Sequence, residues 1–164
     1  MDKDELTNKF KSLGVTDPEG WAESEINEGI PQLARCAWLK GAWQIVPDRD
    51  VTWVDNVLKN YKSNSKEPFY GRDHAIKTMI EYGVTKECIL DLVKAVSGEM
   101  IFHIGYMLDD PGVVIGNSGV NWALVELDSN DEVKGIIPGL HESVLETDPE
   151  DREVAPYGPN YKKG

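Results

Sequence analysis

Apolar residues recur at intervals of three and four along the first two thirds of the chain, and this spacing predicts amphipathic helices. Proline, glycine and short polar stretches interrupt the pattern and supply start and stop signals. The predicted helices run over 3–13, from 18 to a break at 29–31, on to about 42, from 47 to the polar loop 63–66, from 68 to 82, and over 86–108.

Capping residues mark several of these boundaries. Asp17 and Asp48 are placed to accept hydrogen bonds from the exposed amide groups of a first helical turn, and Pro18 fits such a turn. Gly83 can adopt the left-handed conformation that ends a helix, and Thr85 can cap the next helix almost at once. Two helices joined by so short a turn are expected to pack antiparallel.

The segment 86–108 is the most apolar of the predicted helices. In its second half, apolar side chains cover most of the circumference: Met100, Ile101, Phe102, Ile104, Met107 and Leu108. A helix that is apolar nearly all round is typical of a central position, so we expect the other helices to surround it. His103 lies within this segment and is then expected to be substantially buried.

The pattern changes after Asp109 and Asp110, which with Pro111 and Gly112 end the last helix. Residues 120–127 are rich in β-forming side chains, residues 128–131 favour a turn, and residues 133–137 can return as a second strand. Because a two-stranded hairpin is marginally stable alone, it should lie on the helices or recruit residues 113–115 as a third strand.

These elements define the expected fold: mainly α (α+β), with five or six helices around the central apolar helix 86–108 and a small antiparallel hairpin at 120–137. We expect one globular domain over 1–154, because 164 residues with 40% hydrophobic side chains suit a single core. The end of the chain, 155–164, contains prolines and glycines and is expected to be extended or disordered.

The sequence holds 29 acidic and 17 basic residues, which gives a formal net charge of −12. This balance argues against binding to a nucleic-acid duplex, because lysine and arginine contacts to phosphate supply most of that affinity. Residues 1–30 carry a net charge of −5, residues 31–108 of +1, and residues 109–164 of −8. Two interpretations stay open: a solvated surface kept apart by self-repulsion, and an acidic face for a basic protein partner.

Cys36 and Cys88 each lie among apolar residues, so we expect buried thiols and not a disulfide or a metal pair. No apolar stretch approaches the ~20 residues that a membrane span needs, and the first residues lack the apolar run of a signal peptide. We therefore expect a cytoplasmic protein with no membrane partner.

One polar stripe interrupts the apolar helix. Its members are spaced by four, three and four residues, which places them on one side of a helix: Glu99, His103, Tyr106 and Asp110. A carboxylate and an imidazole one turn apart can share a metal ion or orient each other for proton transfer. The same pair can also be a hydrogen-bonded contact at a helix boundary without any catalytic role.

A second cluster, His141 and Glu142, follows the hairpin. If this segment folds back on the helix 86–108, His141 and Glu142 complete a site with His103. Glu99, His103 and His141 are then candidate ligands for a divalent metal ion. The alternative is an exposed loop followed by a short acidic helix.

The chain lacks a glycine-rich phosphate loop, a Gly-x-Ser-x-Gly motif and a Cys-x-x-Cys motif, and it implies no particular cofactor. Of its five tryptophans, Trp43 and Trp53 are the candidates for an exposed binding surface. Two functional hypotheses follow. One is a protein-binding or regulatory module, acting in the manner of an inhibitor or immunity protein, that presents residues 109–153 to a basic partner. The other is a small metal-dependent or acid–base enzyme. The sequence leaves the oligomeric state open.

Overall fold

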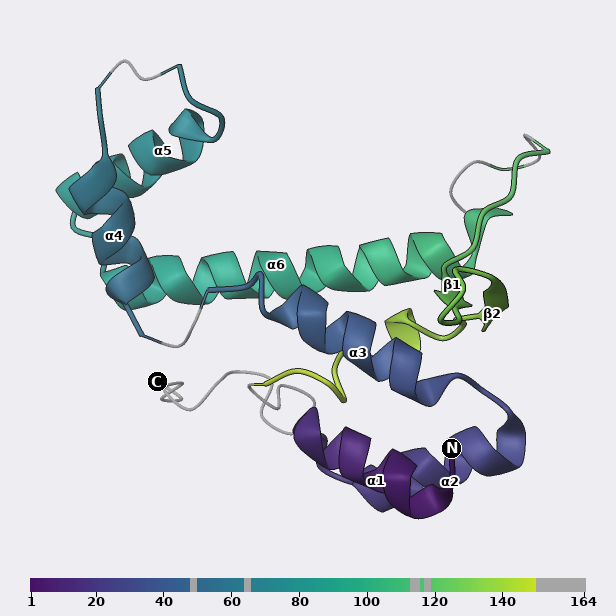
Figure 1. Ribbon diagram of the computed structural model, residues 1–164. Helices are drawn as coiled ribbons and strands as arrows, with labels where there is room; N and C mark the ends of the chain where they lie inside the picture. Colours follow the sequence, from purple (N-terminus) through teal and green to yellow (C-terminus); the bar gives the residue numbers. More distant parts are fainter. Residues whose placement is uncertain (48–49, 64–65, 113–115, 117–118, 150–164) are drawn as a thin grey trace. The chain divides into compact units, whose positions relative to one another are not determined.

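The computed structural model describes residues 1–47, 50–63, 66–112, 116 and 119–149. Within these ranges the chain forms six α-helices, a two-stranded antiparallel sheet and a 3₁₀ turn (Figure 1). The elements are α1 (Lys3–Ser12), α2 (Pro18–Glu28), α3 (Gln32–Trp43), α4 (Thr52–Asn60), α5 (Tyr70–Glu81), α6 (Lys86–Asp109), β1 (Val125–Leu127), β2 (Val133–Ile136) and η1 (His141–Ser143). The expected class, mainly helical with a small antiparallel hairpin, is confirmed.

The chain divides into two compact units. The first unit comprises Met1–Gln44 and Met100–Gly164, and the second comprises Ile45–Glu99. Helix α6 begins in the second unit and ends in the first. The predicted tail, 155–164, lies outside the described residues.

Local capping explains several helix boundaries. The backbone N–H of Gly20 donates to Asp17 Oδ1 at 3.0 Å, and the backbone N–H of Cys88 donates to Thr85 Oγ1 at 3.2 Å. Gly83 follows α5 with a φ of +85°, a conformation that side chains disfavour. These three signals were correctly interpreted from the sequence, because each depends only on neighbouring residues.

Two helices begin later than predicted. Helix α4 starts at Thr52, whose backbone N–H donates to Asp50 Oδ1 at 2.7 Å. The predicted cap, Asp48, lies outside the described residues. Helix α5 starts at Tyr70 and not at Pro68.

The core of the first unit lies between α1, α2 and α3, which pack against one another. A cluster of buried side chains holds them together: Leu6, Phe10, Trp21, Ala22 and Cys36. The rings of Phe10 and Trp21 lie 5.7 Å apart. Leu140 and Val144, from the segment after the hairpin, are also fully buried in the protein.

The second unit has its own core, formed by α4, α5 and the first turns of α6. Its buried residues are Val54, Val57, Ile76, Ile89 and Leu90. Helix α5 packs with α4. Ile76 of α5 also shares a buried cluster with Ile89 and Leu90 of α6. The expected antiparallel packing of α5 along α6 stays a prediction.

Helix α6 is buried along one face and not all round. Ile101 is 8% exposed, whereas Leu92 and Met100 each expose 55% of their surface. His103 is exposed too, so its expected burial is wrong. In the first unit, the segment at Leu140 and His141 lies against α6 at Gly105. Of the helices described, none combines the length and apolar character needed to cross a bilayer.

The hairpin is shorter than the sequence predicts. Val125 pairs with Ile136, and Leu127 pairs with Val133. Before β1, the carbonyl oxygen of Leu124 accepts from the backbone N–H of Ile137 at 2.9 Å, and Trp122 Nε1 donates to the carbonyl oxygen of Met107 at 2.7 Å. The expected third strand, 113–115, lies outside the described residues.

The turn between the strands depends on one carboxylate. Asp128 Oδ1 accepts hydrogen bonds from the backbone N–H groups of Asn130 and Glu132, at 2.8 and 3.0 Å. These bonds lower the pKa of Asp128. Asp131 adopts a φ of +62° within the same turn. The turn signal at 128–131 is thus confirmed.

The two cysteines differ in accessibility. Cys36 is fully buried, and its burial raises the pKa of the thiol to about 11. Cys88 is exposed in the first turn of α6, so the expectation of a second buried thiol is wrong. The difference arises because Cys88 does not share the buried face of α6 with Ile89 and Leu90.

We expect one thiol to react rapidly with a disulfide reagent at pH 8 in the folded protein, and the second only after unfolding. Cys88→Ser should abolish the rapid phase. Folding stability should also fall as the pH rises from about 9 towards 11, because the thiol of Cys36 ionises earlier in the unfolded chain than in the folded one. Two rapid thiols in the native protein would contradict this assignment.

Candidate functional site

The segment after the hairpin folds back onto α6, which was one of the two interpretations left open by the sequence. Gly105 marks the contact: a Cβ atom at this position would lie 3.1 Å from the backbone nitrogen of His141 and 3.3 Å from the Cβ of Leu140. A larger residue at 105 would therefore have to move the segment. The glycine on α6 allows the two backbones to approach.

Asp109 and His141 form the polar centre of this contact. Asp109 Oδ2 accepts from the backbone N–H of His141 at 3.0 Å and lies 2.6 Å from its ring nitrogen Nδ1. The Asp109 side chain is 8% exposed and the His141 side chain 24%. The ring of Tyr106 meets the imidazole edge to face at 4.9 Å, and Phe102 does so at 5.9 Å. The carboxylate and the two rings together fix the orientation of the imidazole.

The residues predicted for the site are only partly brought together. His141 and Tyr106 meet, but the carboxylate bonded to His141 is Asp109 and not the predicted Asp110. Asp109 follows Gly105 by four residues and so shares its buried side of the helix, whereas the next position lies about 100° further round.

The other candidates lie on exposed surface: Glu99, His103, Asp110 and Glu142. Among the described residues, no group of three His, Cys, Asp or Glu side chains is placed to hold a metal ion. A metal-binding role for Glu99, His103 and His141, and a catalytic role for the full set, remain predictions.

Arg35 holds the same segment from the side of α3. Its Nη1 lies 3.4 Å from the carbonyl oxygen of Pro138 and 3.5 Å from that of Gly139, and its Nη2 donates to Gln32. The guanidinium also lies over the ring of Trp21, 5.7 Å from its centroid. Gly139 has a φ of +71°, and a Cβ there would clash with the guanidinium at 2.4 Å. The backbone conformation at 139 therefore favours glycine, and a side chain there would also have to displace the end of the Arg35 side chain.

Arg35 is 9% exposed and lies close to an acidic group of side chains. Burial lowers the pKa of its guanidinium, and the charges of Glu142, Glu146 and Asp109 oppose this effect. Arginine stays protonated in proteins, so the buried charge is balanced by these carboxylates. Arg35 Nε and Asp109 Oδ1 are buried without a hydrogen-bond partner among the described residues.

Two tryptophans anchor the rest of the segment. Trp21 Nε1 donates to Glu146 Oε1 at 2.9 Å, and Trp43 Nε1 donates to the carbonyl oxygen of Val144 at 3.1 Å. Trp43 is 4% exposed, so its expected role on an exposed surface is wrong. Trp53 is partly exposed, and the guanidinium of Arg72 lies 5.7 Å from its ring centroid.

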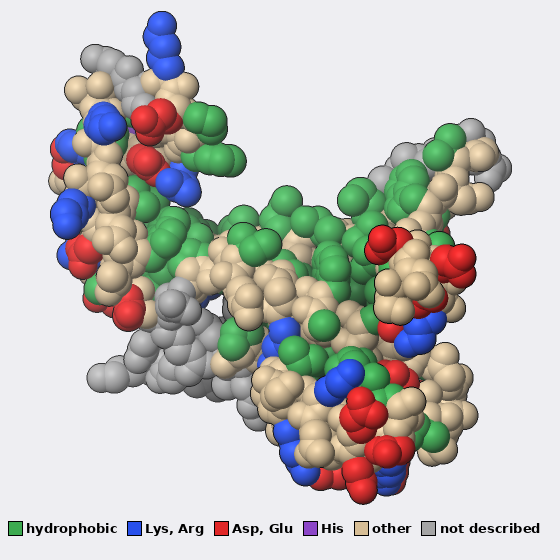
Figure 2. All heavy atoms as spheres, in the orientation of Figure 1, with side chains coloured by type: hydrophobic (Ala, Val, Ile, Leu, Met, Phe, Trp, Pro, Cys, Tyr) green, Lys and Arg blue, Asp and Glu red, His purple; other side chains and the backbone are tan. Residues whose placement is uncertain are grey.

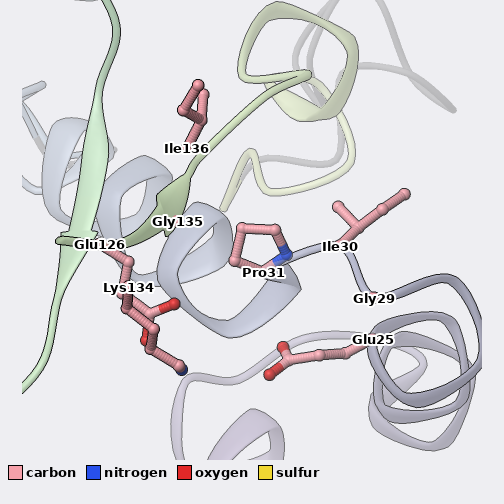
Figure 3. A pocket seen from close by; sticks show the side chains of 8 residues that line it. All are labelled: Glu25, Gly29, Ile30, Pro31, Glu126, Lys134, Gly135 and Ile136. Carbon is pink, nitrogen blue, oxygen red and sulfur yellow. The ribbon is translucent and has the colours of Figure 1, made fainter.

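A second feature of the first unit is an open pocket of about 360 Å³ between the α2–α3 connection and the hairpin (Figure 3). Its lining residues are Glu25, Gly29, Ile30, Pro31, Glu126, Lys134, Gly135 and Ile136. Figure 3 shows the head groups of Glu25, Glu126 and Lys134 directed towards the same space. The pocket therefore combines two carboxylates and one ammonium group with apolar walls.

Each charged group in the pocket has a structural partner. Lys134 Nζ lies 2.7 Å from Glu126 Oε1, and this hydrogen bond raises the pKa of Lys134, as do the charges of Glu126 and Glu25. Glu25 Oε2 accepts from the backbone N–H of Leu33 at 2.7 Å. Glu25 thus caps the first turn of α3, where Pro31 offers no side-chain cap.

The excess of acidic residues is concentrated in the first unit. This unit holds 20 of the 29 acidic residues and 9 of the 17 basic residues, while the second unit is close to neutral. The difference was visible in the sequence as acidic ends around a balanced middle.

Comparison of the chain with protein-family models, curated protein sequences and solved structures finds no match.

The sequence interpretation missed Arg35, Asp109 and Glu25. The sequence did contain a signal for the burial of Arg35. It lies next to Cys36 and one helical turn before Leu39, and both of these apolar residues are buried. An arginine on a buried face is expected to have acceptors elsewhere in the chain. For Glu25 the signal was weaker: a carboxylate shortly before a helix whose N-cap position is occupied by proline, which has no capping side chain.

Replacing Arg35 should destabilise the first unit. We expect Arg35→Met to lower the free energy of unfolding by about 3 kcal/mol, because it leaves Glu142, Glu146 and Asp109 without their cation and the two carbonyl groups without a donor. Urea unfolding at neutral pH measures the change. The matched control, Arg72→Met, removes an exposed arginine and should cost less than about 1 kcal/mol. Equal losses in the two variants would contradict the role of Arg35.

Proposed function

We propose that this chain is a protein-binding or regulatory module and that the outer face of its hairpin binds a basic protein partner. The observation that carries the proposal is the exposure of four apolar side chains on this face: Val125 at 36%, Leu127 at 49%, Val133 at 67% and Ile136 at 60%. Their pairing across the strands, Val125 with Ile136 and Leu127 with Val133, places them on one side.

The orientation of the hairpin is unusual for a surface element. A half-buried antiparallel pair normally turns its apolar face to the core and its charged face to water. Here the charged pair Glu126 and Lys134 faces the α2–α3 connection, and the apolar face is left exposed. Contiguous exposed apolar side chains with a polar rim are typical of protein interfaces.

The charge around this face indicates the chemistry of the partner. Three exposed acidic residues, Asp128, Asp131 and Glu132, lie at the tip of the hairpin. Figure 2 shows acidic and hydrophobic side chains next to one another on this part of the first unit. A basic partner would be attracted by the negative potential and would cover the apolar face. The same potential disfavours a nucleic-acid duplex.

A cytoplasmic location is part of this proposal. The exposed thiol of Cys88 and the absence of a disulfide among the described residues support a reducing compartment.

A second candidate function, acid–base or metal-dependent catalysis, is favoured by the contact between Asp109 and His141. A carboxylate on Nδ1 holds the imidazole in place and leaves Nε2 as the proton-accepting atom of the neutral ring. The same contact also serves to fasten the segment after the hairpin to α6, and this structural role accounts for both hydrogen bonds to Asp109 Oδ2.

The binding proposal predicts that partner capture depends on the hairpin and on salt. Val133→Thr combined with Ile136→Thr keeps β-branched side chains but makes the face polar, so a specific basic partner should be lost or weakened at least about tenfold. Raising the salt concentration from about 0.05 to 0.5 M should weaken the remaining binding further, since charge attraction is screened. Affinity capture with quantitative mass spectrometry, followed by titration with the purified partner, measures both effects.

The control for this experiment is Leu92→Gln, which removes a comparably exposed apolar side chain from the second unit. It should retain the partner. If the hairpin variant and the control retain the same proteins with the same affinities, or if the partner is acidic, the proposal is wrong.

Variants of His141 separate the structural from the catalytic role. His141→Asn keeps an N–H donor near Nδ1 but has no group that takes up a proton at neutral pH. A structural role predicts that Asn changes the free energy of unfolding by less than about 1 kcal/mol, while His141→Leu lowers it by about 1–3 kcal/mol because Asp109 loses its partner. A metal site predicts that Zn²⁺ raises the melting temperature of the parent and not of His141→Asn; no rise in the parent contradicts it.

A further inference from the structure

The pocket beside the hairpin combines charged groups with apolar surface. We propose that this pocket, lined by Glu25, Glu126 and Lys134 over Ile30 and Pro31, receives an arginine side chain of the partner. The inference rests on the proposed function, because it assumes that the partner is a basic protein. It adds a second contact beside the exposed apolar face of the hairpin, and Ile136 belongs to both.

The charge of the pocket favours a cation. Glu25 and Glu126 bring two negative charges, and Lys134 balances one of them through its 2.7 Å contact with Glu126. The Glu25 carboxylate accepts a hydrogen bond from a backbone N–H and faces the pocket, and among the described residues it forms no ion pair. Two carboxylates and one ammonium group therefore leave one net negative charge among the side chains that line the pocket.

The shape of the pocket suits a long side chain with an apolar stem. Its volume of about 360 Å³ lies near the lower end of the range for small-ligand sites. A single side chain with its backbone therefore fits the pocket. Gly29 and Gly135 contribute no side chains to the walls, and Ile30 and Pro31 offer apolar surface. The methylene groups of a partner residue can lie on this surface while its charged end reaches the carboxylates.

Arginine fits this arrangement better than lysine. Its planar guanidinium presents five N–H donors and can bond to carboxylates on two sides at once, whereas an ammonium group is a compact and more strongly hydrated charge. Lys134 already shows that one ammonium group is held by Glu126. In the proposed complex, the guanidinium bonds to Glu25 and Glu126 while Lys134 keeps its contact with Glu126.

A titration with a blocked arginine tests the pocket directly. Adding N-acetyl-arginine amide to the ¹⁵N-labelled full chain should shift the amide signals of Gly29 and Gly135 in a saturable way. The citrulline analogue has nearly the same shape without the charge and should produce no saturable shift. The lysine analogue should bind at least about fivefold more weakly. Equal binding of lysine and arginine, or no saturable shift with arginine, overturns the inference.

Charge-removing variants locate the site. Glu25→Gln and Glu126→Gln keep a hydrogen-bond acceptor, so the cap on α3 and the contact with Lys134 are retained, but each should weaken arginine binding about fivefold or more. Lys134→Met should strengthen it. Glu87→Gln, a matched charge change in the second unit and outside the pocket, should leave it unchanged. A similar loss in the Glu87 variant would show that only the net charge of the protein matters and would overturn the site.

The two proposals can fail separately. If a basic partner depends on Val133, which does not line the pocket, but not on Glu25, the hairpin face functions as proposed and the arginine pocket is wrong. If Gly29 and Gly135 respond to arginine with the expected variant pattern while no basic protein binds the hairpin face, the pocket stands and the proposed function is wrong.

Discussion

A guanidinium group that leaves water needs hydrogen-bond acceptors and negative charge in its place, and in the first unit this requirement falls on Arg35. The acceptors are carbonyl groups at Pro138 and Gly139, more than a hundred residues away in the chain. The negative charges come from the acidic segment that follows them. One buried cation thus determines where an otherwise weakly apolar segment must lie. Once Leu140 and Val144 are buried with it, Asp109 and His141 are brought into contact.

The sequence predicts those parts of the fold that depend on near neighbours. Asp17, Thr85 and Gly83 end or begin helices through contacts within four residues, and these positions are found as expected. Burial of α6 was overestimated because it depends on distant parts of the chain. An apolar surface on a helix does not specify which segment packs against it. Leu92 and Met100 look like core positions in the sequence and are more than half exposed.

The candidate site also shows that the local sequence does not determine contacts with distant segments. The periodicity of α6 correctly places Tyr106 near His141, but a shift of one residue decides whether Asp109 or Asp110 meets the imidazole. That choice depends on Gly105, because only the side of the helix that carries this glycine admits the backbone of His141. The meaning of a single glycine in an apolar helix becomes clear only when its neighbour across the fold is known.

The acidic residues of the first unit serve two purposes: some only accept hydrogen bonds, and others balance a buried positive charge. A neutral amide could replace a carboxylate in the first role but not in the second. Glu25 caps α3 and Glu126 bonds to Lys134, and a glutamine could accept either hydrogen bond. Asp128 needs only an acceptor for the two N–H groups of its turn. By contrast, the charges around Arg35 balance a buried cation, and neutral groups would not do so. At the hairpin the fold therefore requires acceptors but not charge. Repulsion between like charges destabilises the compact state, so the charge that the fold does not need is the part that our proposal assigns to a basic partner.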